Sequence, residues 1–364
     1  MILHRYFARR FLWMFLALLA VFATFQLLLD FTELLRRLDD RVGLGQVIRM
    51  TFLKTPEGLY QIIPLVMILA TISLFIGLSR SSELVVTRAS GRSGLTLLAG
   101  PVTVALIIGM LIVGVMNPLV ATTSKHYQEQ LEAYRSGGGS VLSIGSEGLW
   151  LRQGDPQGQT VIRAARANGD ASVLYDVTFI AYAPEAGPVR RIHAAEASLD
   201  QDGWTLTDAK AWPLAAGLNP ETSSERHETL RIPSTLTQES IRDRFGNPAS
   251  ISVWNLPAFI TDLEDAGISA RRHLVWLQME LARPVFLLAM VLIGAAFTMR
   301  PARLGHTGLG ILSAVLLGFG LYYVRSFAQV MGENGQLSPL LAAWVPPVAS
   351  VLLALGLVLQ MEDG

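Results

Sequence analysis

The sequence has no cysteine and only three lysines among its 364 residues, and these shortages exclude several kinds of active site. Without cysteine there is neither a disulfide nor a thiolate metal site, and the six histidines show no ligand spacing such as His-Glu-x-x-His. Lys54, Lys125 and Lys210 follow Leu, Ser and Ala, so the phosphate-binding motif Gly-Lys-Ser/Thr is absent. No serine stands in a Gly-x-Ser-x-Gly motif. We therefore expect a chain that is not an enzyme and binds no metal or cofactor of its own.

Charge is also missing from long stretches of the chain, which indicates a protein that crosses a membrane. Between Arg92 and Lys125 there are 32 consecutive uncharged residues. The uncharged stretches are 11–29, 58–79, 93–124, 307–324 and 334–361. Each is near or above the roughly 20 residues that span a hydrocarbon core, and a sixth apolar stretch, 274–299, contains two charges. We predict six transmembrane helices with both termini on one side. The alternative, a signal peptide over the first stretch, is disfavoured because no small-x-small cleavage site follows.

Arginines beside these stretches predict the side of the membrane on which each loop lies. Basic residues gather in cytoplasmic loops, so the N-terminus and the loops after spans two and four are expected in the cytoplasm. These arginines are Arg5, Arg9, Arg10, Arg80, Arg88, Arg92, Arg300 and Arg303. The polar insert 118–270 then lies outside, in the periplasm if the source is Gram-negative. It has 12 basic against 19 acidic residues, so its net charge is −7 and the rest of the chain carries +7.

The insert has the pattern of an antiparallel β-domain. Six short runs with alternating or β-branched residues, from VLSIGSEGLWLRQ to HETLRIPS, are separated by Gly, Pro, Asn and Asp. We expect a sandwich or open jellyroll whose free edge can dock a similar domain by strand addition. Segments 234–245 and 252–267 predict two short helices that return the chain to the membrane. The predicted fold is therefore membrane α-helical with an inserted periplasmic all-β jellyroll-like domain, divided into 1–117 (spans one to three), 118–270, and 271–364 (spans four to six).

A group of cations in the first external loop departs from the charge rule. These residues are Arg36, Arg37, Arg41, Arg49 and Lys54. In one interpretation their side chains snorkel to lipid phosphates. In the other they form an anion site facing the outer leaflet, where Glu33 shares a helical stripe with Arg37 and Arg41 and holds the guanidinium groups in place. Arginine suits such a site because its planar fork binds phosphate oxygens in pairs.

Three charged residues inside or at the end of apolar spans are further candidates for an anion site. Glu280 and Arg283 lie three residues apart in the fourth span, and Arg325 lies near the external end of the fifth. Charges within spans usually face a bundle interior or a cavity and mark a transport path. The alternative is a simple ion pair between Glu280 and Arg283 within one helix.

Three longer motifs carry a resemblance to a known family. They are PEGLYQIIPLVMILATISLFIGLSRSSELVVTRASGRS, SISVWNLPAFITDLEDAG and LSPLLAAWVPPV. Together they resemble the lipopolysaccharide export permease family, LptF and LptG, over nearly the whole chain, and SELVVTRASG is more similar to the LptG pattern. The resemblance implies a permease subunit of an ABC transporter that extracts lipopolysaccharide from the bacterial inner membrane and passes it to a periplasmic bridge toward the outer membrane.

Alternatives to an LptG-type permease are an LptF-type subunit of the same complex and, less well matched, a lipoprotein-release permease, for which four spans and an insert after the first are expected. A membrane-anchored hydrolase or a scaffold would need a catalytic constellation or would lack a coupling helix. The resemblance also implies partners: an LptF-type permease in a heterodimer and an LptB-type ATPase dimer that uses ATP and Mg²⁺. An LptC-type single-span protein and an LptA-type bridge complete the path of the lipopolysaccharide among membrane lipids, and no nucleic acid is involved.

Residues of this sequence can be assigned to these roles. The segment of about 80–92 has an apolar strip beside charges, so it can form a short cytoplasmic helix that sits in a groove of a partner, with a solvated turn as the plain alternative. In the family this segment is the coupling helix. The resemblance implies that the ATPase-coupling residues are Glu83, Leu84, Arg88 and Gly91, with Glu83 in an ion pair with the ATPase. It implies that the residues binding the lipid A headgroup are Arg36, Arg37, Arg41, Glu280, Arg283 and Arg325, while apolar walls of spans one and five hold the acyl chains.

Overall fold

The computed structural model divides the chain into two compact units, which are described separately. The helical unit contains Met1–Tyr127, Ser252–Trp254 and Leu274–Gly364, and the β unit contains Gln128–Ile251 and Asn255–His273. The structure describes residues 2–37, 43–89, 91, 93–136, 142–145, 148–155, 158–168, 172–183, 187–200, 203–214, 219–234, 247–265, 268–299 and 307–363. Arg41, Arg92, Arg300, Arg303 and the predicted helix after Ser234 lie outside the described residues.

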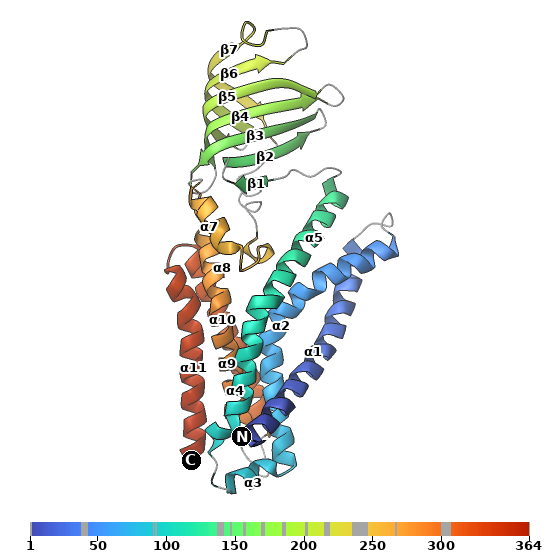
Figure 1. Ribbon diagram of the computed structural model, residues 1–364, viewed down its shortest axis with the longest axis vertical. Coiled ribbons are helices and arrows are strands. Elements are labelled where there is room, and N and C mark those ends of the chain that lie inside the picture. Colours follow the sequence, from blue (N-terminus) through green and yellow to red (C-terminus); the bar gives the residue numbers. More distant parts are fainter. Residues whose placement is uncertain are drawn as a thin grey trace. The chain divides into compact units, whose positions relative to one another are not determined.

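Long apolar helices make up the helical unit, because a helix satisfies its backbone hydrogen bonds locally and can therefore cross a lipid core. The helices that contribute to it are α1 (Ile2–Arg37), α2 (Leu44–Arg80), α3 (Glu83–Ala89), α4 (Gly94–Leu111), α5 (Asn117–Ser136), α8 (Arg271–Leu281), α9 (Arg283–Thr298), α10 (Thr307–Glu333) and α11 (Pro339–Asp363). One π-helical turn, Ile112–Met116, joins α4 to α5. The start of α1, the end of α11 and the short helix α3 lie at the same end of this unit (Figure 1).

Five helices of the described residues are long and apolar enough to cross a membrane, and one bent pair is a further candidate. The five are α1, α2, the continuous α4–α5 helix, α10 and α11. The pair is α8 and α9, which meet at 47°. Pro284 explains the bend, because it has no N–H to donate to the backbone carbonyl of Glu280. The predicted six spans therefore depend on counting the bent pair as one span.

The core of the helical unit lies around α2 and α9. Nearly every residue of α9 is buried, and Phe286 and Met290 join a cluster with Met67 of α2. The close approach of α4 to α9 requires a glycine, because a Cβ on Gly109 would lie 2.7 Å from the Cα of Pro284. Helices α1, α10 and α11 expose many large apolar side chains, as expected of surfaces that face lipid or a partner.

Among the described residues of the β unit, seven antiparallel strands form one sheet, side by side in chain order (Figure 1). They are β1 (Leu142–Gly145), β2 (Gly148–Asp155), β3 (Gly158–Ala167), β4 (Val173–Ala183), β5 (Gly187–Asp200), β6 (Gly203–Pro213) and β7 (Glu225–Pro233). All six predicted runs form strands, and the first run divides into β1 and β2. The antiparallel β character of the insert is thus confirmed.

The sheet curls, so that strands far apart in its order come together. Gln153 of β2 donates from Nε2 to the carbonyl of Pro233 at 3.5 Å and accepts a 2.7 Å hydrogen bond from the hydroxyl of Ser234, just after β7. Within the buried interior the rings of Phe179 (β4) and Trp204 (β6) lie 6.0 Å apart. The described strands therefore enclose an apolar face by curling one sheet. Of the two predicted alternatives, the single curled sheet agrees with an open jellyroll, because a sandwich needs a separate second sheet.

Between the sheet and α8 the chain forms a 3₁₀ turn, Pro248–Ser250, and helix α7, Leu256–Asp265. The second of the two predicted return helices is thereby confirmed. Its buried residues Leu256, Ile260 and Leu263 follow the spacing of one helical face. The segment between the turn and the helix, Ser252–Trp254, belongs to the helical unit.

Candidate functional site

The last turn of α1 presents two predicted anion-binding residues to solvent. Arg36 and Arg37 are both exposed, and Arg37 Nη2 lies 2.8 Å from Glu33 Oε1 one turn earlier. The predicted pairing of Glu33 with Arg37 is therefore present. Cations at a helix C-terminus interact favourably with the helix dipole, which helps to hold both guanidinium groups at this end of α1. Attraction for an anion therefore comes from the two arginines and not from the dipole.

Lys54 of α2 forms ion pairs with two carboxylates near the end of α1. Lys54 Nζ lies 2.5 Å from Glu33 Oε2 and 3.3 Å from Asp30 Oδ1. Asp30 is only 2 % exposed and also accepts hydrogen bonds from Gln26 and Thr55, each 3.2 Å long. Glu33 is therefore shared between Lys54 and Arg37. The sequence groups Lys54 with the cations of the anion site, whereas the structure places it as the counter-ion of two carboxylates.

Glu280 and Arg283 form a buried ion pair across the bend between α8 and α9. Their side chains are 1 % and 8 % exposed, and Arg283 donates to both carboxylate oxygens, from Nη2 at 2.6 Å and from Nε at 3.1 Å. The guanidinium lies over the ring of Tyr60, 3.9 Å from its centroid, and the Tyr60 hydroxyl donates to Glu280. The two residues are thus engaged with each other, as in the ion-pair interpretation, and their role in headgroup binding stays a prediction.

Arg325 reaches the same bend from α10. Its Nη2 donates to the carbonyl of Met279 at 3.3 Å, and its Cζ lies 5.2 Å from the centroid of the Phe286 ring. The residue is 7 % exposed, and its Nε has no hydrogen-bond partner among the described residues. The three charged residues predicted within spans therefore come together at one break in the helices.

Sequence reasoning missed two polar residues of this cluster, Tyr60 and Asn117. Asn117 is 3 % exposed and donates from Nδ2 to the Tyr60 hydroxyl at 3.4 Å. Tyr60 lies near the start of the uncharged stretch 58–79 and Asn117 lies inside the stretch 93–124, where a buried phenol or amide needs a hydrogen-bond partner. The sequence therefore indicates that each of these side chains needs a partner, but it does not reveal which residue supplies the hydrogen bond.

The predicted coupling helix is shorter than the segment 80–92. Helix α3 has seven residues, because Arg80 still belongs to α2 and the turn at Ser82 takes a positive φ of 59°. Gly91 has φ 79°, a conformation that glycine adopts without strain. This is consistent with the predicted sharp exit toward α4.

Glu83, the first residue of α3, binds within its own chain. Its carboxylate accepts hydrogen bonds from Arg10 Nη1 at 2.9 Å, the Tyr6 hydroxyl at 2.9 Å and the Ser81 hydroxyl at 2.7 Å. Burial raises the pKa of Glu83, but the hydrogen bonds from Ser81, Arg10 and Tyr6 outweigh it and leave this pKa below its ordinary value. The arrangement holds α3 against the start of α1.

The remaining α3 residues divide into an inner and an outer face. Leu84 is 1 % exposed and belongs to the core of the helical unit, whereas Val85 and Val86 are 52 % and 68 % exposed. Two adjacent exposed valines on a short helix form an apolar surface that water disfavours. The side chain of Arg88 lies outside what the structure describes.

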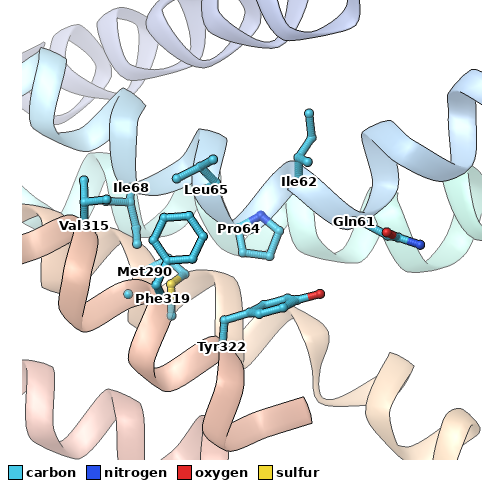
Figure 2. Close-up of a pocket in the computed structure, with 10 residues that line it drawn as sticks. Gln61, Ile62, Pro64, Leu65, Ile68, Met290, Val315, Phe319 and Tyr322 are labelled. Atoms are coloured by element: carbon cyan, nitrogen blue, oxygen red, sulfur yellow. The ribbon is translucent and has the colours of Figure 1, made fainter. Parts of the chain in front are cut away.

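An apolar pocket of about 200 Å³ opens between α2, α9 and α10 (Figure 2). Its lining residues are Gln61, Ile62, Pro64, Leu65, Ile68, Met290, Val315, Gly318, Phe319 and Tyr322. Figure 2 shows the apolar side chains facing one another, with the polar ends of Gln61 and Tyr322 on the same side. The predicted acyl-chain walls were spans one and five, whereas this pocket uses span five together with α2 and α9.

Comparison with known proteins gives one consistent answer. Residues 5–360 match the family model described as lipopolysaccharide export system permease LptF/LptG. The chain is 23 % identical to lipopolysaccharide export system permease protein LptG of Haemophilus influenzae, over 86 % of this chain and 87 % of that protein. It is 21 % identical to the LptG protein of Escherichia coli K12, over 88 % and 86 %. The chain therefore belongs to the LptF/LptG family of lipopolysaccharide export system permeases.

Proposed function

We propose that this chain is the LptG-type permease subunit of an ABC transporter that extracts lipopolysaccharide from the inner membrane and passes it to a periplasmic bridge. The observation that carries the proposal is the family match over residues 5–360, which includes both the helical unit and the β unit. The LptG-like segment SELVVTRASG and the LptG relatives favour this branch over LptF.

The anion site at the end of α1 binds the phosphates of the lipid A headgroup in this proposal. Arg36 and Arg37 are exposed there, and Arg41 follows four residues later in the sequence. Because Lys54 already neutralises Asp30 and shares Glu33, the arginines keep charge available for an anion. Glu280 and Arg283 are buried and bind each other, so they are less suited to binding a phosphate than the exposed Arg36 and Arg37.

Acyl chains occupy the apolar pocket between α2, α9 and α10. A volume of about 200 Å³ with mostly apolar lining holds part of a hydrocarbon tail and keeps it from water, where each exposed methylene would cost about 0.8 kcal/mol. Gln61 and Tyr322 give the pocket a polar end. The curled sheet of the β unit, with its own apolar interior, offers a second place for tails, in the periplasm.

The energy for extracting the lipid comes from ATP hydrolysis by a partner subunit. An LptB-type ATPase dimer uses ATP and Mg²⁺ and contacts α3, where Val85 and Val86 offer an exposed apolar surface. An LptF-type permease completes the heterodimer, and LptC-type and LptA-type proteins receive the lipid. This assignment shifts the ATPase contact from Glu83, which is engaged with Arg10, to the two valines.

Native mass spectrometry of the detergent-extracted complex tests the proposal. The expected assembly has one copy of this chain, one second permease whose sequence is of the LptF branch, two ATPase subunits and bound lipopolysaccharide. Purification without any ATPase contradicts the transporter assignment. A second permease of the LptG branch would instead assign this chain to the LptF-type role.

A further inference from the structure

A short segment, Ser252–Trp254, packs on the helical unit although the chain on both sides of it belongs to the β unit. Val253 is 6 % exposed, and its backbone N–H donates to Oδ1 of Asn117 at 2.8 Å. The indole N–H of Trp254 donates to the carbonyl of Gly114 at 3.0 Å. The segment is therefore attached to the helical unit by two hydrogen bonds between residues far apart in the sequence.

Its attachment point is the π-helical turn Ile112–Met116. A π-helical turn shifts the backbone hydrogen-bond register, and such turns are often found at functional sites. Gly114 lies within it, and the indole packs against it, with Trp254 Cζ2 3.7 Å from the position that a Cβ on Gly114 would take. The segment thus docks where the α4–α5 helix is irregular.

From this point a series of buried contacts leads to the bend between α8 and α9. Asn117 of α5 donates to the Tyr60 hydroxyl of α2, and that hydroxyl donates to Glu280 of α8. Glu280 in turn binds Arg283, the first residue of α9. Four helices each contribute one residue to a continuous path that begins at the Val253 amide.

The geometry of this path depends on the bend. Glu280 and Arg283 stand on opposite sides of the 47° break, so a change in the angle moves the two charged groups relative to each other. Pro284 supplies no backbone N–H there, so the angle can change without breaking a hydrogen bond from that residue. Because the groups are buried, Tyr60 must follow the carboxylate or leave it with fewer partners, which is costly in a low-dielectric interior.

We propose that Tyr60 and Asn117 are positioning residues that transmit a change at the α8–α9 bend to Ser252–Trp254, and so to the adjoining chain on either side of that segment. The inference rests on the proposed function for its driving force, which is ATP hydrolysis by the partner subunit. The alternative is a static set of contacts that only satisfies buried polar groups. Transmission predicts that the exchange rate of the Val253 amide changes with bound nucleotide, whereas static contacts predict no change.

Hydrogen–deuterium exchange of the Val253 amide in the assembled complex distinguishes them. The complex is compared without nucleotide and trapped with ATP and vanadate. Transmission predicts that wild-type exchange differs about tenfold between the two states, and that Tyr60→Phe reduces the difference to about twofold or less. Tyr60→Phe removes the hydroxyl but keeps the ring beneath Arg283. The control is Tyr323→Phe, which removes a phenol hydroxyl from a residue of α10 that is 68 % exposed and should leave the wild-type difference intact.

Trp254→Phe is a second variant, in case Tyr60→Phe assembles poorly. Trp254 is itself 68 % exposed, so the change removes the indole N–H with little effect on folding, and it should also reduce the response of Val253. Equal wild-type exchange in both states, or a full response in an assembled Tyr60→Phe complex, overturns the proposal. If Tyr60→Phe does not assemble, a full response in Trp254→Phe overturns it. ATP hydrolysis and lipopolysaccharide release by the same wild-type preparation report separately on the proposed function, so its failure is distinguishable.

Discussion

Arg10 of α1 places its Nη1 2.9 Å from the carboxylate of Glu83, which begins α3, and so ties the short helix to the first span. The Arg10 guanidinium also lies over the ring of Tyr6, 5.8 Å from its centroid. The two side chains of the pair are 28 % and 35 % exposed, so solvent screens the interaction. The pair thus positions α3 without fixing it rigidly.

Breaking this ion pair should loosen α3. With its partial exposure we expect the pair to contribute about 0.5–1 kcal/mol, which corresponds to about two- to fivefold faster exchange of the α3 amides in Arg10→Gln or Glu83→Gln. The charge swap Arg10→Glu with Glu83→Arg should restore much of the protection. If Glu83→Gln abolishes ATPase association while Arg10→Gln has no effect, Glu83 belongs to the ATPase interface as the resemblance implied.

The same pair predicts a pH dependence. The pKa of Glu83 is lower in the folded chain than its ordinary value of 4.5, so the ionised carboxylate stabilises the folded state. This contribution is complete above pH 4.5 and is lost as the pH falls through the folded pKa. Exchange of the α3 amides, corrected for intrinsic pH effects, should therefore be independent of pH near neutrality and accelerate only in acid. Glu83→Gln should remove the acid-dependent component.

The two faces of α3 should respond differently to substitution. Val86→Asp places a charge on the exposed face and should reduce co-purification of the ATPase while thermal unfolding of the chain stays unchanged. Leu84→Ala removes buried side-chain atoms and should lower the free energy of unfolding by about 2–5 kcal/mol. Undiminished ATPase binding by Val86→Asp would show that the exposed valines are not the contact.

The arginines at the end of α1 should be required for lipid release. Reversing both charges, Arg36→Glu with Arg37→Glu, should reduce ATP-dependent lipopolysaccharide release from proteoliposomes at least about tenfold, since a hydrogen bond to a charged group contributes about 1.5–3 kcal/mol. Lysine should rescue only in part because it lacks the fork geometry. Arg5→Glu changes the charge of an exposed residue near the other end of α1 and is the matched control, with ATPase rate as the assembly check. Full release by the double variant returns these residues to the snorkelling interpretation.

Filling the apolar pocket should displace lipid. Val315→Phe adds bulk to the lining, and overpacking of about 1–3 kcal/mol predicts that lipopolysaccharide bound per complex falls about tenfold. Leu312→Phe, at a residue of the same helix that is 53 % exposed, should bind as wild type. Mass spectrometry of bound lipid gives both values, and equal binding by the two variants contradicts a lipid role for the pocket.

The sequence by itself determined the elements, because their causes are local. Charge-free stretches become long helices since each backbone group in lipid must find its partner within the segment. Alternation in the six runs of the insert sets which side chains share a face, so Phe179 and Val177 were predictable as inward residues of one strand. The pairing of Glu33 with Arg37 is likewise a consequence of helical spacing.

Only the tertiary structure decided which distant groups meet. Arg10 finds Glu83 across 73 positions, and Tyr60 finds Glu280 across 220, because packing of the helices brings these side chains together. The curl that joins Gln153 to Ser234 is a property of the whole sheet, accumulated over seven strands. Spacing along the chain offers several charged partners for each of these groups, and packing selects one, since a buried polar side chain is stable only beside the particular donor or acceptor that reaches it.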